Sequence, residues 1–303
     1  MIIPFIESLG ISNIKTLSGF HNQIFEGQYN DDAIIIRVSH RRSKEEILEE
    51  VHVLNTIKHA VNIAEPYAIN NDYVLSYDHK AVAFFKKIDG LNWHETTLTD
   101  ETHYNAGRAL GKLHQALQKI SNITRQSYDK HPDIKLLYNL DPIYQKQAET
   151  LLSQLKKDDK HDNEFGLIHG DYLFSNLLYH GKDMTIIDFD DIEYNYYLYD
   201  IAVYLFYLIL GGNPADIDIQ SNKNVFKNFI KGYRKVNPTT VLDFDKIHML
   251  FKLRQLKLLA TIKTTYNPNN YGPWQKAYIA LCNNQFKHNE NFIDIDYTTL
   301  LTI

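Results

Sequence analysis

The chain has 303 residues, of which 44% are hydrophobic and 23% are charged, a composition typical of a globular protein rather than a disordered one. Its net charge is −5 and its pI is about 6.3, which argues against nucleic acid as the main partner, because general nucleic-acid binders usually have a pI above about 9. The single cysteine, Cys282, excludes an internal disulfide and is typical of a reducing compartment. The N-terminus shows no basic leader and the apolar run 198–210 is too short to span a bilayer, so we expect a cytoplasmic protein without a membrane partner.

The first 90 residues predict short strands arranged around one amphipathic helix. The helix begins at a capping box, in which Ser43 is followed three residues later by Glu46, and its apolar positions recur at helical spacing up to Ile57. The order β-β-α-β-β favours an antiparallel sheet with the helix against it. The expected strands are 23–29, 33–38, 73–77 and 81–85.

Beyond residue 90 the pattern becomes mostly helical, with one short β segment at 165–189. The change in composition near residues 86–90 divides the chain into an N-terminal lobe, 1–87, and a C-terminal lobe, 88–303. The predicted fold class is therefore α+β, with a ligand-binding cleft expected between a small sheet lobe and a larger helical lobe. The expected helices are 99–120, 143–155, 198–210, 222–235, 243–265 and 273–288.

The β segment contains two short apolar runs separated by a four-residue turn, which is typical of a hairpin. If Tyr179 pairs with Met184, Asn176 lies opposite Ile187 and next to Asp188. An amide oxygen and a carboxylate then meet at one end of the hairpin. Both are hard oxygen ligands suited to Mg²⁺, which binds proteins through carboxylates together with substrate phosphates.

The same stretch reads His169-Gly170-Asp171-x4-Asn176, followed by Asp188-Phe189-Asp190. Protein kinases carry His-Arg-Asp-x4-Asn followed by Asp-Phe-Gly, where the first Asp orients the substrate hydroxyl and the Asn and second Asp hold the metals. Together with Tyr199-Asp200-Ile201-Ala202, the pattern resembles the aminoglycoside phosphotransferase and choline kinase family, the small-molecule relatives of protein kinases. The Asp-Phe-Asp-Asp form and an Arg-bearing late helix are more similar to its homoserine-kinase-like and stress-response-kinase-like branches.

The resemblance implies a protein-kinase-like two-lobe fold and an ATP- and Mg²⁺-dependent kinase. Such an enzyme moves the γ-phosphoryl group to a hydroxyl of a small acceptor, for example an amino alcohol, a sugar or an aminoglycoside. It implies that Asp171 is catalytic, that Asn176 and Asp188 bind metal, and that His169 and Asp200 support the catalytic loop.

Upstream, the resemblance assigns the nucleotide-binding positions. Arg37, on the expected third strand of the family, is a phosphate contact, and Glu50 on the following helix is its partner, with Glu46 and Glu49 as competing candidates. Backbone groups of Lys86 and Ile88 are expected to bond the adenine edge. The segment 18–22 is the expected phosphate-covering loop, although it holds a single glycine.

Three alternatives to a small-molecule kinase remain open. The first is a protein Ser/Thr kinase of the stress-response type, but this sequence leaves little room after Asp188 for the long activation loop of such an enzyme. The second is a non-catalytic nucleotide-binding regulator, which the complete motif disfavours. A metallohydrolase built on His169, Asp171, Asp188 and Asp190 lacks a second histidine cluster. For Asp190 and Asp191 three roles remain open: binding a second metal, capping the next segment, or facing a cationic substrate. Arg254 is either a solvated residue or a residue near the substrate.

Overall fold

The computed structural model describes residues 2–17, 19, 22–157, 160–215 and 219–293. The chain divides into two compact units, each assembled from separated stretches of sequence. The sheet unit comprises residues 1–97, 115–125 and 175–191, and the helical unit comprises residues 98–114, 126–174 and 192–303. The lobe boundary at residues 87 and 88 stays a prediction from composition.

The sheet unit is built on a five-stranded antiparallel sheet with the strand order β1-β2-β3-β5-β4. Alternate residues of β3, namely Ile34, Ile36 and Val38, are fully buried, as the period of a half-buried strand requires. The four predicted strands are present, and each of their bounds lies within one residue of the prediction. The strands are β1 (Ser12–Leu17), β2 (Gln23–Tyr29), β3 (Asp32–Ser39), β4 (Val74–Tyr77) and β5 (Lys80–Lys86).

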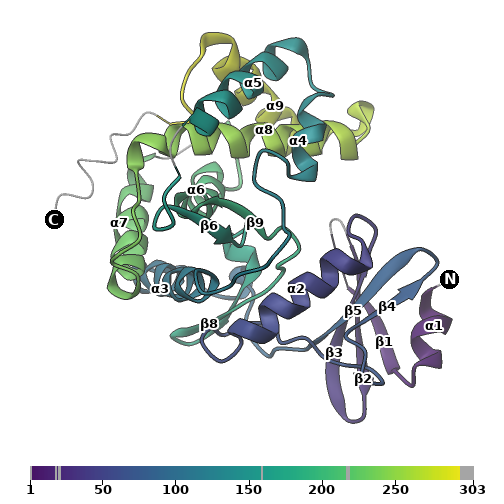
Figure 1. The fold of residues 1–303 in the computed structure, drawn as a ribbon. Helices are drawn as coiled ribbons and strands as arrows, with labels where there is room; N and C mark the ends of the chain where they lie inside the picture. The colour runs from purple at the N-terminus through teal and green to yellow at the C-terminus, as the bar shows by residue number, and fades with distance from the viewer. Residues whose placement is uncertain (1, 18, 20–21, 158–159, 216–218, 294–303) are drawn as a thin grey trace. The chain divides into compact units, whose positions relative to one another are not determined.

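Two helices accompany this sheet. Helix α2 (Lys44–Ile57) begins at the predicted capping box, with both the Ser43 and the Glu46 side-chain hydrogen bonds present. It buries Ile47 and Leu54 and lies along the sheet in Figure 1. Helix α1 (Ile2–Ser8) places Ile6 in the core formed by the inward residues of the strands.

The predicted β-β-α-β-β order was incomplete, because it omitted β1 and α1. Strand β1 is a sheet edge whose residues are almost all exposed, so its sequence lacks the apolar alternation by which strands are recognised. Helix α1 is only two turns long and buries one residue fully, too little for a helical period to appear. With β1 present, the strand that carries Arg37 is the third strand of the chain.

A second, two-stranded sheet in the sheet unit is the predicted hairpin, formed by β7 (Leu177–His180) and β8 (Asp183–Ile186). Its register pairs Tyr179 with Met184, as predicted, and Gly181 in the turn has φ +63°. Backbone bonds join the hairpin to the rest of the unit, since the amide of Leu91 donates to the carbonyl of Tyr179 at 3.0 Å.

The helical unit centres on α8, which packs against α4, α5, α6 and α9 (Figure 1). It also contains a two-stranded antiparallel sheet of β6 (Phe165–Ile168) and β9 (Glu193–Tyr196). Helix α4 and strand β9 are short and were not predicted. The helices are α3 (Asp100–Leu117, whose last turn clusters with the sheet unit), α4 (Pro132–Leu137), α5 (Pro142–Lys157), α6 (Tyr197–Leu210), α7 (Ile219–Val236), α8 (Ile247–Thr265) and α9 (Pro273–His288). Short 3₁₀ turns lie at Trp93–Glu95, Phe174–Asn176, Phe244–Lys246 and Pro268–Asn270.

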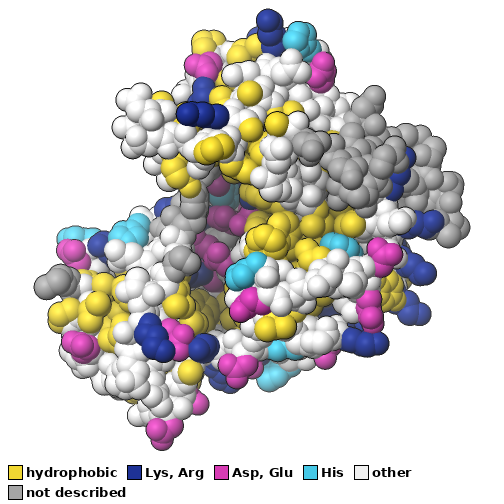
Figure 2. All heavy atoms as spheres, turned by 180° about the vertical axis from the view of Figure 1, so that it is seen from behind, with side chains coloured by type: hydrophobic (Ala, Val, Ile, Leu, Met, Phe, Trp, Pro, Cys, Tyr) yellow, Lys and Arg dark blue, Asp and Glu magenta, His cyan; other side chains and the backbone are white. Residues whose placement is uncertain are grey.

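The predicted fold class is confirmed, with a small antiparallel sheet and a larger, mostly helical part. Helix α6 is buried along almost its whole length, which explains its apolar run as a core helix. No helix in the described part of the chain is long and apolar enough to cross a membrane. On the face drawn in Figure 2, basic side chains lie interspersed with acidic ones, in keeping with 32 Lys and Arg against 37 Asp and Glu.

Candidate active site

The loop that follows β6 in the helical unit is held by a buried carboxylate. Asp200 on α6 is fully buried, and its two oxygens accept the backbone N–H groups of His169 and Gly170, each at 2.8 Å. Gly170 has φ +82°, a conformation that glycine adopts without steric cost. His114 on α3 places its Nε2 3.1 Å from the same carboxylate. The carboxylate therefore has three polar partners, as a buried charge requires.

The ring of His169 is also buried and makes a hydrogen bond within the loop. Its Nδ1 accepts the backbone N–H of Asp171 at 3.3 Å. The backbone of the loop is thus fixed at three successive residues, 169 to 171, by side chains inside the unit.

Asp171 receives a charged partner from α8. Nη2 of Arg254 lies 2.5 Å from Oδ1 of Asp171 and 2.7 Å from the hydroxyl oxygen of Tyr207 on α6. Burial disfavours the charged guanidinium, but Tyr207, Asp171 and Tyr199 raise the pKa of Arg254 well above its usual value. Arg254 is therefore a largely buried cation paired with Asp171 rather than a solvated residue on the face of the helix.

In the sheet unit, the hairpin sets the position of Asn176 and Asp188. The register continues one residue beyond the strands, where the N–H of Ile187 donates to the carbonyl of Asn176 at 3.0 Å. Asp188 follows directly, with φ +63°, a conformation that Asp tolerates better than most residues and that often occurs at functional sites. Its side chain is 51% exposed, which leaves it accessible to a ligand. The predicted juxtaposition of these two residues is confirmed, and their role is not decided by it.

Arg37 and Glu50 form a buried two-point ion pair between β3 and α2. The Nη1–Oε1 distance is 3.0 Å and the Nη2–Oε2 distance is 2.6 Å. Burial opposes the charge on Arg37, but Glu50, Asp190 and Asp188 together raise its pKa above the usual value. Nη1 of Arg37 also lies 3.9 Å from Oδ1 of Asp188. The guanidinium is thus anchored by Glu50 and directed toward the end of the hairpin.

The competing glutamates of α2 have other partners. Glu46 completes the capping box with the N–H of Ser43, and Glu49 accepts the N–H and the hydroxyl of Thr124 at 2.5 and 2.8 Å. Among the three candidates, Glu50 is therefore the residue that pairs with Arg37.

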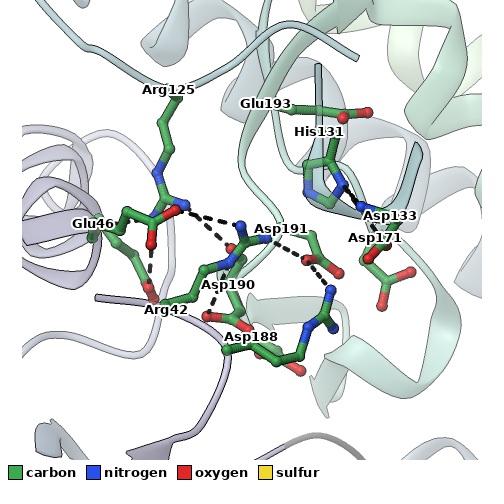
Figure 3. A network of polar contacts seen from close by, with 12 residues as sticks. Arg42, Glu46, Arg125, His131, Asp133, Asp171, Asp188, Asp190, Asp191 and Glu193 are labelled. Carbon is green, nitrogen blue, oxygen red and sulfur yellow. Dashed lines mark hydrogen bonds and ion pairs between the residues drawn. The ribbon is translucent and has the colours of Figure 1, made fainter. Parts of the chain in front are cut away.

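Two buried arginines that sequence reasoning missed hold the segment after Asp188 (Figure 3). Arg42 lies 2.9 Å from Asp191 and 3.9 Å from Asp190, and these carboxylates, with Glu46, raise its pKa against the opposing effect of burial. Arg125 donates to the backbone carbonyls of Glu46 at 2.9 Å and Asp190 at 3.4 Å. Asp190 and Asp191 are thus engaged in local ion pairs and hydrogen bonds.

The two residues expected to bond the adenine edge, Lys86 and Ile88, lie at the end of β5 and just after it. The backbone N–H of Lys86 donates to the carbonyl of Glu65 at 2.8 Å, and its ammonium pairs with the Glu65 carboxylate at 3.0 Å. The Lys86 N–H is thus engaged within the sheet unit. Ile88 is half-buried. Of the expected phosphate loop, residues 18, 20 and 21 lie outside the described residues, and the amide of Asn22 contacts Asp190 at 3.5 Å.

Comparisons with known proteins identify the family of the chain. The model of the phosphotransferase enzyme family, APH, matches residues 13–238, which is most of the chain. The chain belongs to this family. Membership of this family, together with relatives that are kinases, confirms the predicted enzyme class, an ATP-dependent kinase. It also confirms the prediction that the chain belongs with the small-molecule phosphotransferases.

Individual relatives are distant but extend over nearly all of this phosphotransferase. It is 24% identical over 314 residues to amicoumacin kinase of Bacillus subtilis strain 168, covering 95% of this chain and 91% of the relative. It is also 24% identical over 288 residues to stress response kinase A of Salmonella paratyphi A, covering 87% of this chain and 82% of the relative.

Solved structures confirm the protein-kinase-like fold of this phosphotransferase. A structure of amicoumacin kinase hAmiN in complex with AMP-PNP, Ca²⁺ and Ami has a TM-score of 0.87 at 18% identity, covering 98% of this chain and 96% of that one. A microcompartment-associated aminopropanol kinase has a TM-score of 0.69 at 19% identity, covering 95% and 98%.

Proposed function

We propose that this phosphotransferase moves the γ-phosphoryl group of Mg·ATP to a hydroxyl group of a small molecule. The observation that carries the proposal is the hairpin register, with the N–H of Ile187 on the carbonyl of Asn176 at 3.0 Å. It puts Asn176 and Asp188 at one end of the hairpin, where Arg37 lies 3.9 Å from Asp188. Two oxygen donors beside an anchored guanidinium suit a metal-bound polyphosphate.

The donor set fits a divalent metal, because an amide oxygen and a carboxylate oxygen are hard ligands. We assign the metal to Asn176 and Asp188, and the metal would neutralise charge on the phosphates. Arg37 would bind phosphate oxygens, with Glu50 holding its guanidinium in place. The adenine edge would be bonded by backbone groups at Lys86 and Ile88, with Lys86 using its carbonyl since its N–H is engaged.

Asp171 is assigned to the acceptor. Its carboxylate would orient the acceptor hydroxyl and receive its proton, while the acceptor oxygen bonds to the γ-phosphorus and the bond from that phosphorus to the bridging oxygen breaks. ADP leaves with the bridging oxygen. Asp200 and His169 would keep the loop in position through the backbone bonds at residues 169 to 171. Positioning is the main demand of this reaction, because the transferring group requires little covalent chemistry from the protein.

For the acceptor, we propose a small hydroxyl-bearing molecule of the amicoumacin or amino-alcohol type. Support comes from the 24% identity to amicoumacin kinase over 95% of the chain and from the TM-score of 0.87 to hAmiN, against 0.69 for the aminopropanol kinase. The amino alcohol predicted from the sequence is the same broad chemical class as aminopropanol.

The similarity to stress response kinase A supports a second candidate, a protein Ser/Thr kinase. The segment between Asp188 and α6 speaks against it. Only residues 189–196 lie there, and the last four form β9, which pairs with β6. This leaves little chain for an activation loop that would dock a peptide.

The test is a coupled assay of ADP release with Mg·ATP and a panel of acceptors: amicoumacin, 1-amino-2-propanol, homoserine, choline, aminoglycosides and casein. Asp171→Asn should lose acceptor-stimulated turnover, whereas Asp183→Asn, an exposed aspartate at the other end of the same hairpin, should not. Stimulation by casein alone would favour the protein kinase. ATP binding without turnover in every case would favour a nucleotide-binding regulator.

A further inference from the structure

Arg254 makes a contact that the proposed transfer does not by itself require. One nitrogen, Nη2, reaches both Oδ1 of Asp171 and the hydroxyl oxygen of Tyr207. The Arg254 side chain is only 13% exposed and the Asp171 side chain 23%. A charge-assisted hydrogen bond in such a place is stronger than one between neutral groups and fixes the geometry of both partners.

The neighbouring cation on α8 indicates what Arg254 is for. Lys257, one turn further on, is buried with Glu193 and lies 3.4 Å from both of its carboxylate oxygens. The two cations are therefore balanced pair by pair, Lys257 by Glu193 and Arg254 by Asp171. Arg254 does not supply an uncompensated positive charge for an anionic acceptor, and its charge acts on Asp171.

A cation at this distance has two physical effects on a carboxylate. It favours the ionised form, which is the form that accepts a proton from a hydroxyl. It also restricts rotation of the side chain, because Oδ1 is held at Nη2 while Nη2 is held at the Tyr207 hydroxyl. Both effects act on the group that faces the acceptor in the proposed reaction.

We propose that Arg254 is a positioning residue for phosphoryl transfer, which keeps the Asp171 carboxylate ionised and oriented toward the acceptor hydroxyl. The proposal rests on the proposed function in assigning the acceptor to Asp171. Tyr207 assists by fixing the guanidinium. The titratable and charged side chains that interact at this place belong to several elements of the helical unit. In its described part they are Arg254 and Lys257 of α8, Tyr199 and Tyr207 of α6, Asp133 of α4, Glu193 of β9, Tyr278 of α9 and His169 of the loop itself.

The first experiment measures the pH dependence of kcat for Arg254→Gln and Arg254→Lys, with Lys263→Gln as the matched control. Lys263 is on the same helix and pairs with the exposed Asp141. We expect Arg254→Gln to lower kcat about 10- to 100-fold and to move the acidic limb of the profile to higher pH, with little change in the KM for ATP. Arg254→Lys keeps the charge, so its acidic limb should stay near that of the wild type.

The second experiment does not depend on turnover. The protein is labelled with ¹³Cγ-aspartate, and the signal of Asp171 is identified as the one missing from Asp171→Asn. In Arg254→Gln its titration midpoint should move to higher pH, whereas in Lys263→Gln it should not. This result also shows that the variant is folded, since the remaining aspartate signals keep their positions.

An unchanged midpoint in Arg254→Gln would overturn the proposal, as would a rise in the KM for the acceptor with kcat and its pH profile unchanged. The latter result would make Arg254 an acceptor-binding residue. If the midpoint shifts in Arg254→Gln but the wild type phosphorylates none of the panel, the two ideas are separated, because the coupling of Arg254 to Asp171 stands while the proposed function fails.

Discussion

Glu50 and Arg37 hold each other in a buried two-point ion pair that joins α2 to β3. Both carboxylate oxygens meet a guanidinium nitrogen, at 3.0 and 2.6 Å, and neither side chain is more than 5% exposed. The guanidinium also lies over the ring of Phe85, 5.0 Å from its centroid. Either charge left alone at this depth would lose most of its solvation without a compensating partner, so each of the two side chains depends on the other.

Glu50→Gln should therefore destabilise the protein and impair nucleotide binding. Removing one partner of a buried pair costs about 3–5 kcal/mol, because the other charge stays buried without compensation. We expect a fall of that size in the free energy of unfolding in urea, together with a higher KM for ATP as Arg37 loses its anchor. Glu26→Gln removes a more exposed pair, with Lys87 at 2.8 Å, and should cost about 0–1 kcal/mol. Equal losses in the two variants would contradict the buried-pair argument.

The hairpin geometry was predictable from sequence because local alternation decides it. Leu177, Tyr179, Met184 and Ile186 are buried, and a slip of one residue would expose them all. The loop-supporting role of Asp200 came from a motif, and the structure adds its three partners. Local alternation therefore carried the prediction for the hairpin, and a motif shared with a family carried that for the loop.

Other parts depended on contacts between distant residues, which a pattern does not encode. Arg125 lies in an irregular stretch after α3, where no period distinguishes a buried arginine from a solvated one. Glu46, Glu49 and Glu50 were equivalent as helix residues until their partners on other elements separated them. Arg254 was ambiguous for the same reason, since its partners lie 83 and 47 residues away in sequence.

Asp200→Asn should loosen the loop that carries Asp171. The amide group replaces one accepting oxygen by a donor that faces a backbone N–H, so one buried N–H loses its partner at a cost of about 1–3 kcal/mol. We expect faster hydrogen exchange at the amides of His169 and Gly170, measured by NMR. We also expect kcat to fall at least about tenfold, the effect of losing roughly one hydrogen bond that positions the loop. Asp141→Asn, an exposed aspartate, serves as the control. Unchanged exchange at both amides would show that the carboxylate does not hold the loop.

Gly107 on α3 should not tolerate alanine, although alanine is the better helix former by about 1 kcal/mol. A Cβ at Gly107 would collide with the carbonyl oxygen of Phe229 on α7, and one at Gly232 would collide with that of Tyr104. Backbone atoms at such a contact cannot move independently of their helices. We expect Gly107→Ala to lower the free energy of unfolding by about 1–3 kcal/mol, since overpacking outweighs helix propensity.

Gly212 provides the comparison for this prediction. No described heavy atom outside its chain neighbours lies within 4 Å of a Cβ built there, so Gly212→Ala should leave stability nearly unchanged. The measurement is urea unfolding followed by far-UV circular dichroism on both variants. A Gly107→Ala protein as stable as the wild type would mean that α3 and α7 separate without cost at this point.

His103 should make the protein less stable in mild acid. The ring is buried on α3, with Nδ1 2.9 Å from the hydroxyl of Tyr204. Burial lowers the pKa of His103 below its usual value, and Asp100 opposes the effect only in part. Below about pH 6.5 the unfolded chain therefore binds a proton on this residue that the folded chain does not, and the contribution to stability falls as the pH falls from about 6.5 toward the lowered folded value.

The sign of this effect is tested by comparing the wild type with His103→Gln at pH 7.5 and pH 5.5. Glutamine retains a hydrogen-bonding group for Tyr204 but does not titrate, so the difference between the two proteins isolates His103 from the other groups that titrate in this range. The wild type should lose more free energy of unfolding on acidification than the variant does. A larger loss in the variant would mean that the buried ring gains a proton on folding, and that burial does not govern its ionisation.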